Sequence, residues 1–278
     1  MPVTRLATRR IEKVWGRHAL GLGFADAPAS GEPVGEIWFE AAGEPELLVK
    51  YLFTSEKLSV QVHPDDDQAR GAGHRQGKEE AWLILAAEAG AVIGLGLRES
   101  IGEAELRAAA QDGSIGALLD WKPVAPGDFF YLPAGTIHAI GAGVALIEVQ
   151  QNADLTYRLY DYGRPRDLHL DAAVAVARRE AWRAPNAPRA IGEGRTVLAE
   201  GRKFVLERWT GERKGRLCPA ASRPVWIAPL DGEGLVGDDT LAAGGVWMAE
   251  GDTPLGFDGN MLVAYPGGEF EPGLFYNS

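Results

Sequence analysis

Cysteine is almost absent from this chain of 278 residues, in which Cys218 is the only one. One thiol cannot form an internal disulfide, and chains without disulfides are typical of reducing compartments. Residues 1–16, MPVTRLATRRIEKVWG, also lack the apolar stretch of a secretory signal peptide. Both absences favour a cytoplasmic protein.

Long apolar runs and a positive charge balance are missing as well. No stretch approaches the roughly 18 apolar residues that span a bilayer, so we expect no membrane partner. With 28 Lys and Arg against 39 Asp and Glu, the net charge is −11. This balance argues against a nucleic-acid partner, because phosphate contacts need a basic face. A local basic pocket for a small phosphate stays open.

Turn-forming residues, in contrast, are abundant. The chain holds 36 Gly and 17 Pro, a composition typical of many short strands and few long helices. Its length fits one large or two ordinary domains. We therefore predict a mainly β protein with a few short helices.

The strand pattern falls into two halves. Apolar, strand-like runs occur at 34–41, 47–53 and 58–63, and on both sides of turns at 88–90 and 133–135. Residues 183–189, RAPNAPR, hold two prolines and predict a linker. The short-strand rhythm then returns without a single histidine. We predict an N-terminal metal-binding barrel over 1–182, a linker over 183–195 and a smaller C-terminal barrel without a metal site over 196–278.

Three helices are expected, with a further short helical turn at 115–121. The acidic residues 65–67 suit a helix N-terminus, since carboxylates are favoured there, although an acidic metal site is the alternative. Residues 100–111 have helical spacing, with Ser100 as N-cap and Glu103 completing a capping box. Residues 168–181 predict a third helix, which would follow the first barrel.

A group of metal-ligand residues is the main chemical signal. Gln61 and His63 are two apart in a strand-like run, so both point to one face. Glu80 opens the next apolar run, and His138 follows a Pro-Ala-Gly turn. Two imidazoles, a carboxylate and an amide oxygen suit a divalent ion such as zinc. The competing interpretation of each histidine is a hydrogen-bonded core residue.

Charged and aromatic residues near this group leave alternatives open. Lys78 shares a strand face with the glutamate two residues later, and is either a surface lysine or a cation that contacts a phosphate or an oxyanion. Asp154 and Arg158 share a face in a polar segment, which is either a solvated edge strand or part of a cleft that binds phosphate or enediolate oxygens. Trp15 and Trp38 fit the core better than the wall of a sugar site.

Seven segments also carry a family resemblance. They are KVWG, VGEIW, LSVQVHPDD, GKEEAW, PGDFFYLPAGTIHAIGAG, EVQQ and TYRLYDYGR, in this order between residues 13 and 164. The chain resembles the short bacterial form of the type I mannose-6-phosphate isomerases, which are zinc enzymes of the cupin superfamily. The resemblance implies two cupin-type jelly-roll barrels and a small sugar-phosphate substrate. It places metal ligands at Gln61, His63, Glu80 and His138, and active-site residues at Lys78 and Arg158.

The sequence departs from the family pattern at two positions. Glu79 stands where the short bacterial forms often have threonine, so either Glu79 or Glu80 is a candidate ligand, and strand phase favours Glu80. Ala153 replaces the serine that precedes an aspartate in the family, which removes a hydroxyl contact. The inserted helical domain of the larger members is absent, apart from the short helices at 100–120.

The predicted reaction is the interconversion of mannose 6-phosphate and fructose 6-phosphate through a cis-enediol. It requires a base near the carbon, an electrophile at the oxygens and an anchor for the phosphate. Arg158 suits the enediolate, and Lys78, Asp154 and a metal-bound water are candidate bases. The alternatives are another metal-dependent cupin enzyme, such as an oxygenase, and a non-catalytic sugar-phosphate-binding cupin. The sequence gives no indication of oligomeric state.

Overall fold

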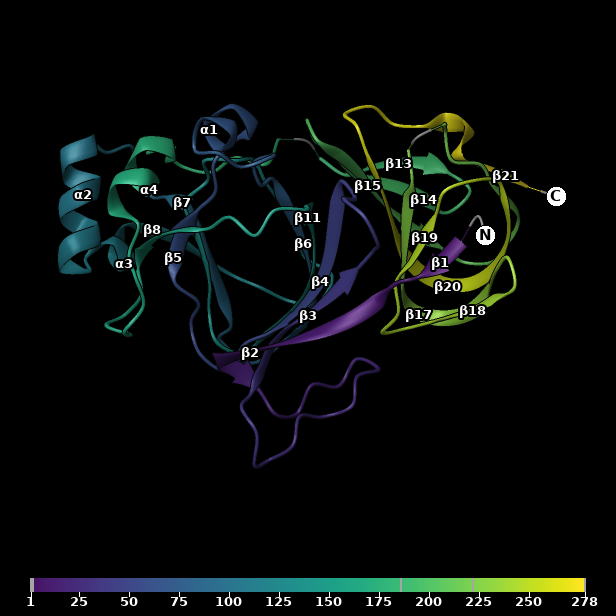
Figure 1. Ribbon diagram of the computed structural model, residues 1–278, viewed down its shortest axis with the longest axis horizontal. Coiled ribbons are helices and arrows are strands. Elements are labelled where there is room, and N and C mark those ends of the chain that lie inside the picture. The colour runs from purple at the N-terminus through teal and green to yellow at the C-terminus, as the bar shows by residue number, and fades with distance from the viewer. Residues whose placement is uncertain (1–2, 186, 222, 278) are drawn as a thin grey trace.

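The computed structural model describes residues 3–185, 187–221 and 223–277, and its elements are mostly strands (Figure 1). Three antiparallel sheets and four short α-helices make up the described part of the chain. The mainly β prediction is therefore confirmed. The outer limits of the predicted domains, at residues 1 and 278, and residue 186 of the predicted linker lie outside the described residues.

A six-stranded sheet forms the centre of the molecule. Its strands, in spatial order, are β2 (Ala7–Arg17), β3 (Val34–Glu40), β4 (Leu47–Phe53), β11 (Val144–Gln151), β6 (Glu80–Ala87) and β9 (Phe129–Leu132). Every residue of β4 and β11 is buried. A sheet that is covered on both faces has nearly continuous apolar strands, which explains the run LLVKYLF in β4.

Alternation along these strands separates the two faces. On one face, Val49, Leu83 and Ile147 join a core cluster that also contains residues of the C-terminal sheet, such as Leu206 and Trp226. On the other face, a second cluster contains the intervening residues of the same three strands, namely Leu52, Trp82, Ile84 and Leu146. The same strand therefore contributes to two different cores according to residue parity.

A five-stranded sheet lies against that second face. Its strands, in spatial order, are β12 (Tyr157–Tyr160), β5 (Val60–Val62), β10 (His138–Ile140), β7 (Val92–Leu97) and β8 (Leu119–Pro123). Its inner side chains, including Ile93 and Leu95, pack against the six-stranded sheet. Its outer face, with Val60 and Val62, is covered by α2 (Glu103–Asp112), α3 (Ile115–Leu118) and α4 (Leu170–Val176) (Figure 1).

Two of the three helix predictions need correction. The helix α1 (Asp66–Gly71) has the expected acidic start, with Asp65 as N-cap. In α2, however, Gly102 is the N-cap and no side chain caps the helix. The capping box predicted at Ser100 is wrong, because the Ile101 N–H is bonded to the Arg179 carbonyl and the helix begins only after it.

The third helix is shorter than predicted. It occupies Leu170–Val176, whereas residues 168–181 were expected. The Arg178 N–H donates to the Gly135 carbonyl, and Gly96 forms a bridge with Ala181. These pairings require an extended backbone, so the helix ends before them. None of the helices in the described ranges has the length and apolar character needed to cross a bilayer.

The third sheet has ten strands and makes up most of the C-terminal half. Seven follow one another in the order β1 (Val3–Arg5), β19 (Trp247–Ala249), β17 (Val225–Val236), β20 (Thr253–Pro266), β15 (Phe204–Thr210), β14 (Arg195–Glu200) and β13 (Arg189–Gly192). The others are β16 (Arg213–Leu217), β18 (Asp239–Ala242) and β21 (Phe275–Asn277), and β21 follows a 3₁₀ turn at Pro272–Leu274.

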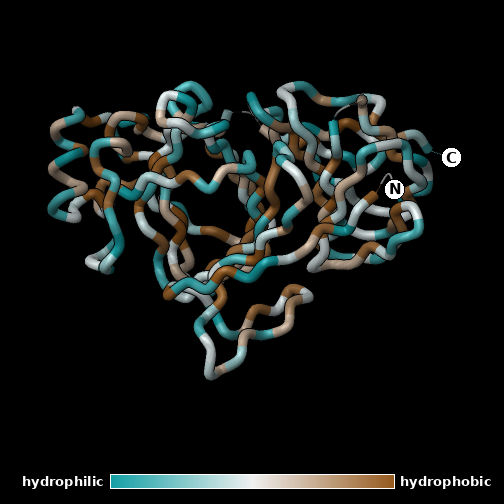
Figure 2. Tube along the Cα trace, in the orientation of Figure 1, coloured by the Kyte–Doolittle hydropathy of each residue, from teal (hydrophilic) through white to brown (hydrophobic). Residues whose placement is uncertain are grey.

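The two ends of this sheet bear on the predicted domain limits, which stay a prediction. The first described strand, β1, pairs with β19 far along the chain, so it belongs to the C-terminal sheet. The strand β13 lies inside the predicted linker and pairs with β14. The sheet encloses its own core, which includes Trp209, Val236 and Leu255. Figure 2 shows the apolar segments concentrated in the strands of both halves.

Candidate metal centre

Strand pairing brings the candidate residues into register on the five-stranded sheet. Gln61 of β5 is paired with His138 of β10 on one side and with Arg158 of β12 on the other. These three positions, which are up to 97 residues apart in sequence, therefore form one row across the sheet. His63 follows two residues after Gln61 and lies on the same face, as predicted from the period of a strand.

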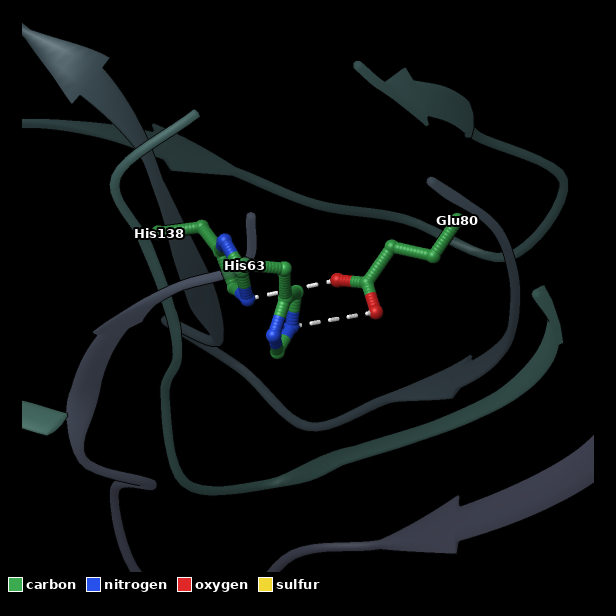
Figure 3. A group of neighbouring side chains, drawn as sticks. All are labelled: His63, Glu80 and His138. Atoms are coloured by element: carbon green, nitrogen blue, oxygen red, sulfur yellow. Dashed lines mark ion pairs between the residues drawn. The ribbon is translucent and has the colours of Figure 1, made fainter. Parts of the chain in front are cut away.

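Two histidines and a glutamate converge between the sheets (Figure 3). The Nε2 atom of His138 is 3.2 Å from Oε1 of Glu80, and Nε2 of His63 is 3.4 Å from Oε2. All three side chains are buried, and their ligand atoms lie within 4.8 Å of one another. Ligands on a single tetrahedral zinc ion lie roughly 3.3 Å apart. The observed spacing therefore fits one ion.

Hydrogen bonds orient both imidazoles toward the carboxylate. Nδ1 of His63 lies 2.8 Å from the Leu155 carbonyl, and Nδ1 of His138 lies 2.9 Å from the Thr136 carbonyl. A carbonyl only accepts, so each Nδ1 carries the proton and each Nε2 keeps its lone pair for a ligand. Carbonyl contacts of this type are common behind metal-binding histidines.

Burial also favours the uncharged imidazoles. Removal from water, together with the Lys78 ammonium, lowers the pKa of His63 to about 3. Burial likewise lowers the pKa of His138. Burial alone would raise the pKa of Glu80, but the Lys78 ammonium holds it well below its ordinary value. Two neutral imidazoles and a carboxylate are the protonation states that bind a divalent metal.

The Glu80 carboxylate itself suits a cation. Both oxygens are buried and accept no well-directed hydrogen bond from the described residues, although Lys78 Nζ lies 2.8 Å from Oε2. Gln61 reaches the same point, because its amide nitrogen is 3.2 Å from Nε2 of His138. Rotation of this amide by half a turn would present its oxygen instead. The donor set is therefore suited to a metal, with the amide as a fourth member.

The adjacent glutamates point in opposite directions. Glu80 faces the imidazoles, whereas Glu79 accepts a hydrogen bond from the Tyr131 hydroxyl on the other face of the sheet. The Glu79 N–H also donates to Oε1 of Gln151, at 3.0 Å. Strand alternation produces this difference, and it places Glu79 away from the cluster.

Lys78 is buried in the site and is not a surface lysine. Its side chain is 6% exposed, and Nζ lies 3.2 Å from Nε2 of His63. Burial alone would lower the pKa of Lys78, but the carboxylates of Glu148 and Glu80 raise it above its ordinary value. The ammonium form is therefore favoured beside the cluster.

A cleft leads from Gln61 and Lys78 to solvent, and its charged lining is mainly basic. Arg158 lies there, half-buried, with its Nε bonded to the Asp167 carbonyl and its N–H bonded to Nδ1 of His169. Asp154 is exposed in the same lining. The cations of the cleft are Lys13, Lys50, Lys78, Arg158 and Arg166, against the carboxylates Glu36, Glu148 and Asp154. Despite its acidic chain, the protein thus has a local basic cleft suited to an anion.

Sequence reasoning missed a buried ion-pair network in this cleft. Lys50 Nζ lies 3.4 Å from Glu148 and 3.7 Å from Glu36, and Lys50 is paired in register with Glu148 across β4 and β11. The Trp82 indole donates to Glu148 at 2.9 Å. The available signal was a single charge within each of two otherwise apolar strands, because buried charges need partners.

The two tryptophans are both part of the cleft wall. Trp15 is buried, as predicted, but its ring also lines the cleft. Trp38 is only half-buried, and Lys50 Nζ lies 4.3 Å from its ring centroid. The prediction of a core position for Trp38 is therefore wrong, and its aromatic side chain lines the cleft.

Comparisons with known proteins were made in sequence and in structure. No family model matches the chain. The chain is 38% identical over 178 residues to the probable mannose-6-phosphate isomerase GmuF of Bacillus subtilis (strain 168). This match covers 62% of this chain and 51% of that protein. The chain is 39% identical over 171 residues to a mannose-6-phosphate isomerase of Streptococcus mutans, covering 59% and 54%. The matches span about half the length of these curated relatives.

The structural comparison covers almost the whole chain. The crystal structure of the mannose 6-phosphate isomerase from Bacillus subtilis is similar, with a TM-score of 0.80 and 26% identity, over 94% of this chain and 98% of that chain. A putative mannosephosphate isomerase from Archaeoglobus fulgidus shares the fold, with a TM-score of 0.74. These findings confirm the mainly β cupin architecture and the resemblance of this chain to the mannose-6-phosphate isomerases.

Proposed function

We propose that the protein is a zinc-dependent isomerase that interconverts mannose 6-phosphate and fructose 6-phosphate through a cis-enediol. The observation that carries the proposal is the buried convergence of His63, Glu80 and His138 beside a cleft lined by Lys78 and Arg158. The names of the similar proteins support mannose 6-phosphate as a substrate. A net basic lining in an acidic protein suits the phosphate of such a sugar.

The metal would be held by Gln61, His63, Glu80 and His138. Imidazole and carboxylate ligands suit zinc, and the spacing of the Nε2 and Oε atoms fits a single small ion. When bound, such an ion polarises the sugar oxygens as a Lewis acid. A divalent ion with one carboxylate and three neutral ligands would keep a net positive charge, which would attract the sugar oxygens.

Isomerisation of the open-chain aldose to the ketose moves one proton from C2 to C1 and a second proton from O2 to O1. We assign Lys78 to a sugar oxygen, where its favoured ammonium form donates a hydrogen bond. We assign Arg158 to the enediolate, since its guanidinium donates to the Asp167 carbonyl at the cleft and its backbone N–H donates to Nδ1 of His169. Asp154 is our candidate base, because it is an exposed carboxylate in the same cleft, whereas Lys78 favours its protonated form.

A coupled assay of the purified protein on mannose 6-phosphate tests the proposal. We expect turnover that is lost on exhaustive chelation and restored by zinc, with one metal ion per chain by elemental analysis. Full activity in the chelated, metal-free protein would rule out the metal role. Saturable binding of mannose 6-phosphate without turnover, in the zinc-loaded protein, would instead identify a non-catalytic sugar-phosphate-binding cupin.

A further inference from the structure

The C-terminal sheet contacts the segments that carry the metal-site residues. Lys203, in the turn between β14 and β15, has its Nζ 2.6 Å from Oδ2 of Asp66 at the start of α1. Asp66 is only three residues after His63. Within the described residues the only group with metal-ligand spacing is His63, Glu80 and His138, so the C-terminal sheet holds no site of its own there. Its contact with Asp66 is therefore a candidate for a supporting role.

The second oxygen of Asp66 reaches the other ligand-bearing segment. Oδ1 accepts hydrogen bonds from the Gly77 N–H and from Nε2 of Gln151, both at 2.9 Å. Gly77 is followed directly by Lys78, whose N–H donates to the Pro64 carbonyl. The segment after His63 and the segment before Glu80 are thus held side by side.

Two further contacts make this arrangement specific. A Cβ atom on Gly77 would lie 2.4 Å from the Pro64 carbonyl oxygen, so only glycine allows the two segments to approach this closely. The Gln151 amide bonds Asp66 through Nε2 and the Glu79 N–H through Oε1. Its two contacts tie Asp66 to the residue that precedes Glu80. We call Asp66, Gly77, Gln151 and Lys203 the Asp66 clamp.

We propose that Asp66 and Lys203 are positioning residues, through which the C-terminal sheet fixes the spacing of His63 and Glu80 and so raises the affinity for the metal. The inference rests on the proposed metal site. Neither residue touches the cluster, so each acts through the backbone that carries the ligands. Lys203 donates a hydrogen bond to one carboxylate oxygen of Asp66 and so fixes the side chain. The other oxygen accepts hydrogen bonds from the Gly77 N–H and from Gln151, and so fixes the segment that precedes Glu80.

Titration of the metal-free full-length protein with Co²⁺, followed by visible absorption against a competing chelator, measures this effect. We expect Asp66→Asn to weaken Co²⁺ binding about tenfold, as for residues that support metal ligands. We expect Lys203→Met to weaken it about two- to fivefold, as for a partly exposed ion pair. Lys203→Arg should keep the wild-type affinity, because it keeps the charge.

Arg223→Met provides a matched control. The Arg223–Glu271 pair has side-chain exposures of 28% and 30%, against 29% and 18% for Lys203 and Asp66, and both cations belong to the C-terminal half. Arg223→Met should lower the melting temperature and leave Co²⁺ affinity unchanged. At saturating metal, kcat of Lys203→Met should return to the wild-type value.

Two outcomes would overturn the inference, and they are distinguishable. Wild-type Co²⁺ affinity in both Asp66→Asn and Lys203→Met would reject the positioning role and leave the proposed function intact. A wild-type protein that binds no Co²⁺ would reject the proposed function and the inference with it. If Asp66→Asn does not fold, Lys203→Met alone decides, because its half-buried side chain lies in a turn.

Discussion

Two buried glutamates, one in each half of the molecule, show what distinguishes a site from a core. Glu207 of the C-terminal sheet accepts four hydrogen bonds, two from Arg195 at 2.9 and 3.0 Å, one from Trp209 at 2.8 Å and one from Tyr265 at 2.7 Å. Glu80 is equally buried, yet in the described part of the chain its oxygens accept no well-directed hydrogen bond and face two imidazoles.

The difference lies in the donors around each carboxylate. Arg195, Trp209 and Tyr265 supply protons to Glu207, so its charge is compensated within the fold. The Nε2 atoms beside Glu80 carry lone pairs and do not compensate its charge, so the Lys78 ammonium, 2.8 Å from Oε2, is its cationic neighbour. A buried carboxylate that faces two nitrogen lone pairs therefore indicates a cation site, whereas one whose neighbours are all N–H and O–H groups indicates a structural role.

The largest expected effect is the loss of the metal from the proposed site around Glu80. His138→Ala should lower metal affinity by more than about 100-fold, because a ligand matters more than the residues that support ligands. Turnover should fall to background. Metal content after gel filtration and the coupled isomerase assay measure both quantities.

The matching change in the C-terminal half should affect stability and leave metal binding unchanged. Glu207→Gln should keep the metal and lower the free energy of unfolding by about 3–5 kcal/mol, since it leaves Arg195 buried without its charge partner. Urea unfolding followed by tryptophan fluorescence measures this loss. Normal metal content in His138→Ala, or metal loss in Glu207→Gln, would remove the distinction between the two carboxylates.

The next largest effect, a loss of turnover without a loss of metal, distinguishes the role of the cleft from that of the metal cluster. Arg158→Ala should keep its metal and lower kcat about 10²–10³-fold, as for the loss of one group that stabilises an oxyanion. Arg164→Ala is the control, because Arg164 pairs with Asp161 and Glu56 and is absent from the lining of the cleft. Equal loss of turnover in both variants would mean that Arg158 acts through folding rather than through the reaction.

The smallest effect concerns the ion pair that joins the two halves. Burial alone would raise the pKa of Asp66, but hydrogen bonds from Lys203, Gln151 and Gly77 lower it from 3.8 to about 2. The native state therefore favours the ionised form. Its stabilisation is present above pH 3.8 and is lost as the pH falls toward 2.

Comparison with Asp66→Asn over that pH range isolates this contribution. The variant should lose less stability than the wild type between pH 4 and 2, by less than about 1 kcal/mol because solvent screens the partly exposed pair. Acid unfolding curves measure the difference. Identical pH dependence in both proteins would show that Asp66 titrates alike in the folded and unfolded chains.

Strand alternation made most of the site predictable from sequence. It placed Gln61 and His63 on one face, and it favoured Glu80 over Glu79, as the structure shows. Alternation is a local property, so it can be read without knowledge of the fold. The pairing of β1 with β19 could not be predicted in this way, since it joins segments about 240 residues apart.

The errors had a similar origin. Lys50 and Glu148 were overlooked because each lies in an apolar run, and only the register of β4 with β11 shows that they face each other. The capping box at Ser100 satisfied a local rule, but a backbone bond from Ile101 to Arg179 delayed the helix. In both cases a contact between distant segments outweighed the local pattern.

The central six-stranded sheet has a consequence for how this protein can vary. In β4, β6 and β11, odd-numbered side chains such as Val49, Leu83 and Ile147 face the C-terminal half. Of the even-numbered ones, Lys50 and Glu148 line the cleft and Glu80 faces the imidazoles. Inserting one residue between Glu79 and Glu80 would exchange the two faces of β6 alone, sending the Glu80 carboxylate into an apolar core. Substitutions can therefore tune either half separately, whereas a change in length within these strands disrupts both at once.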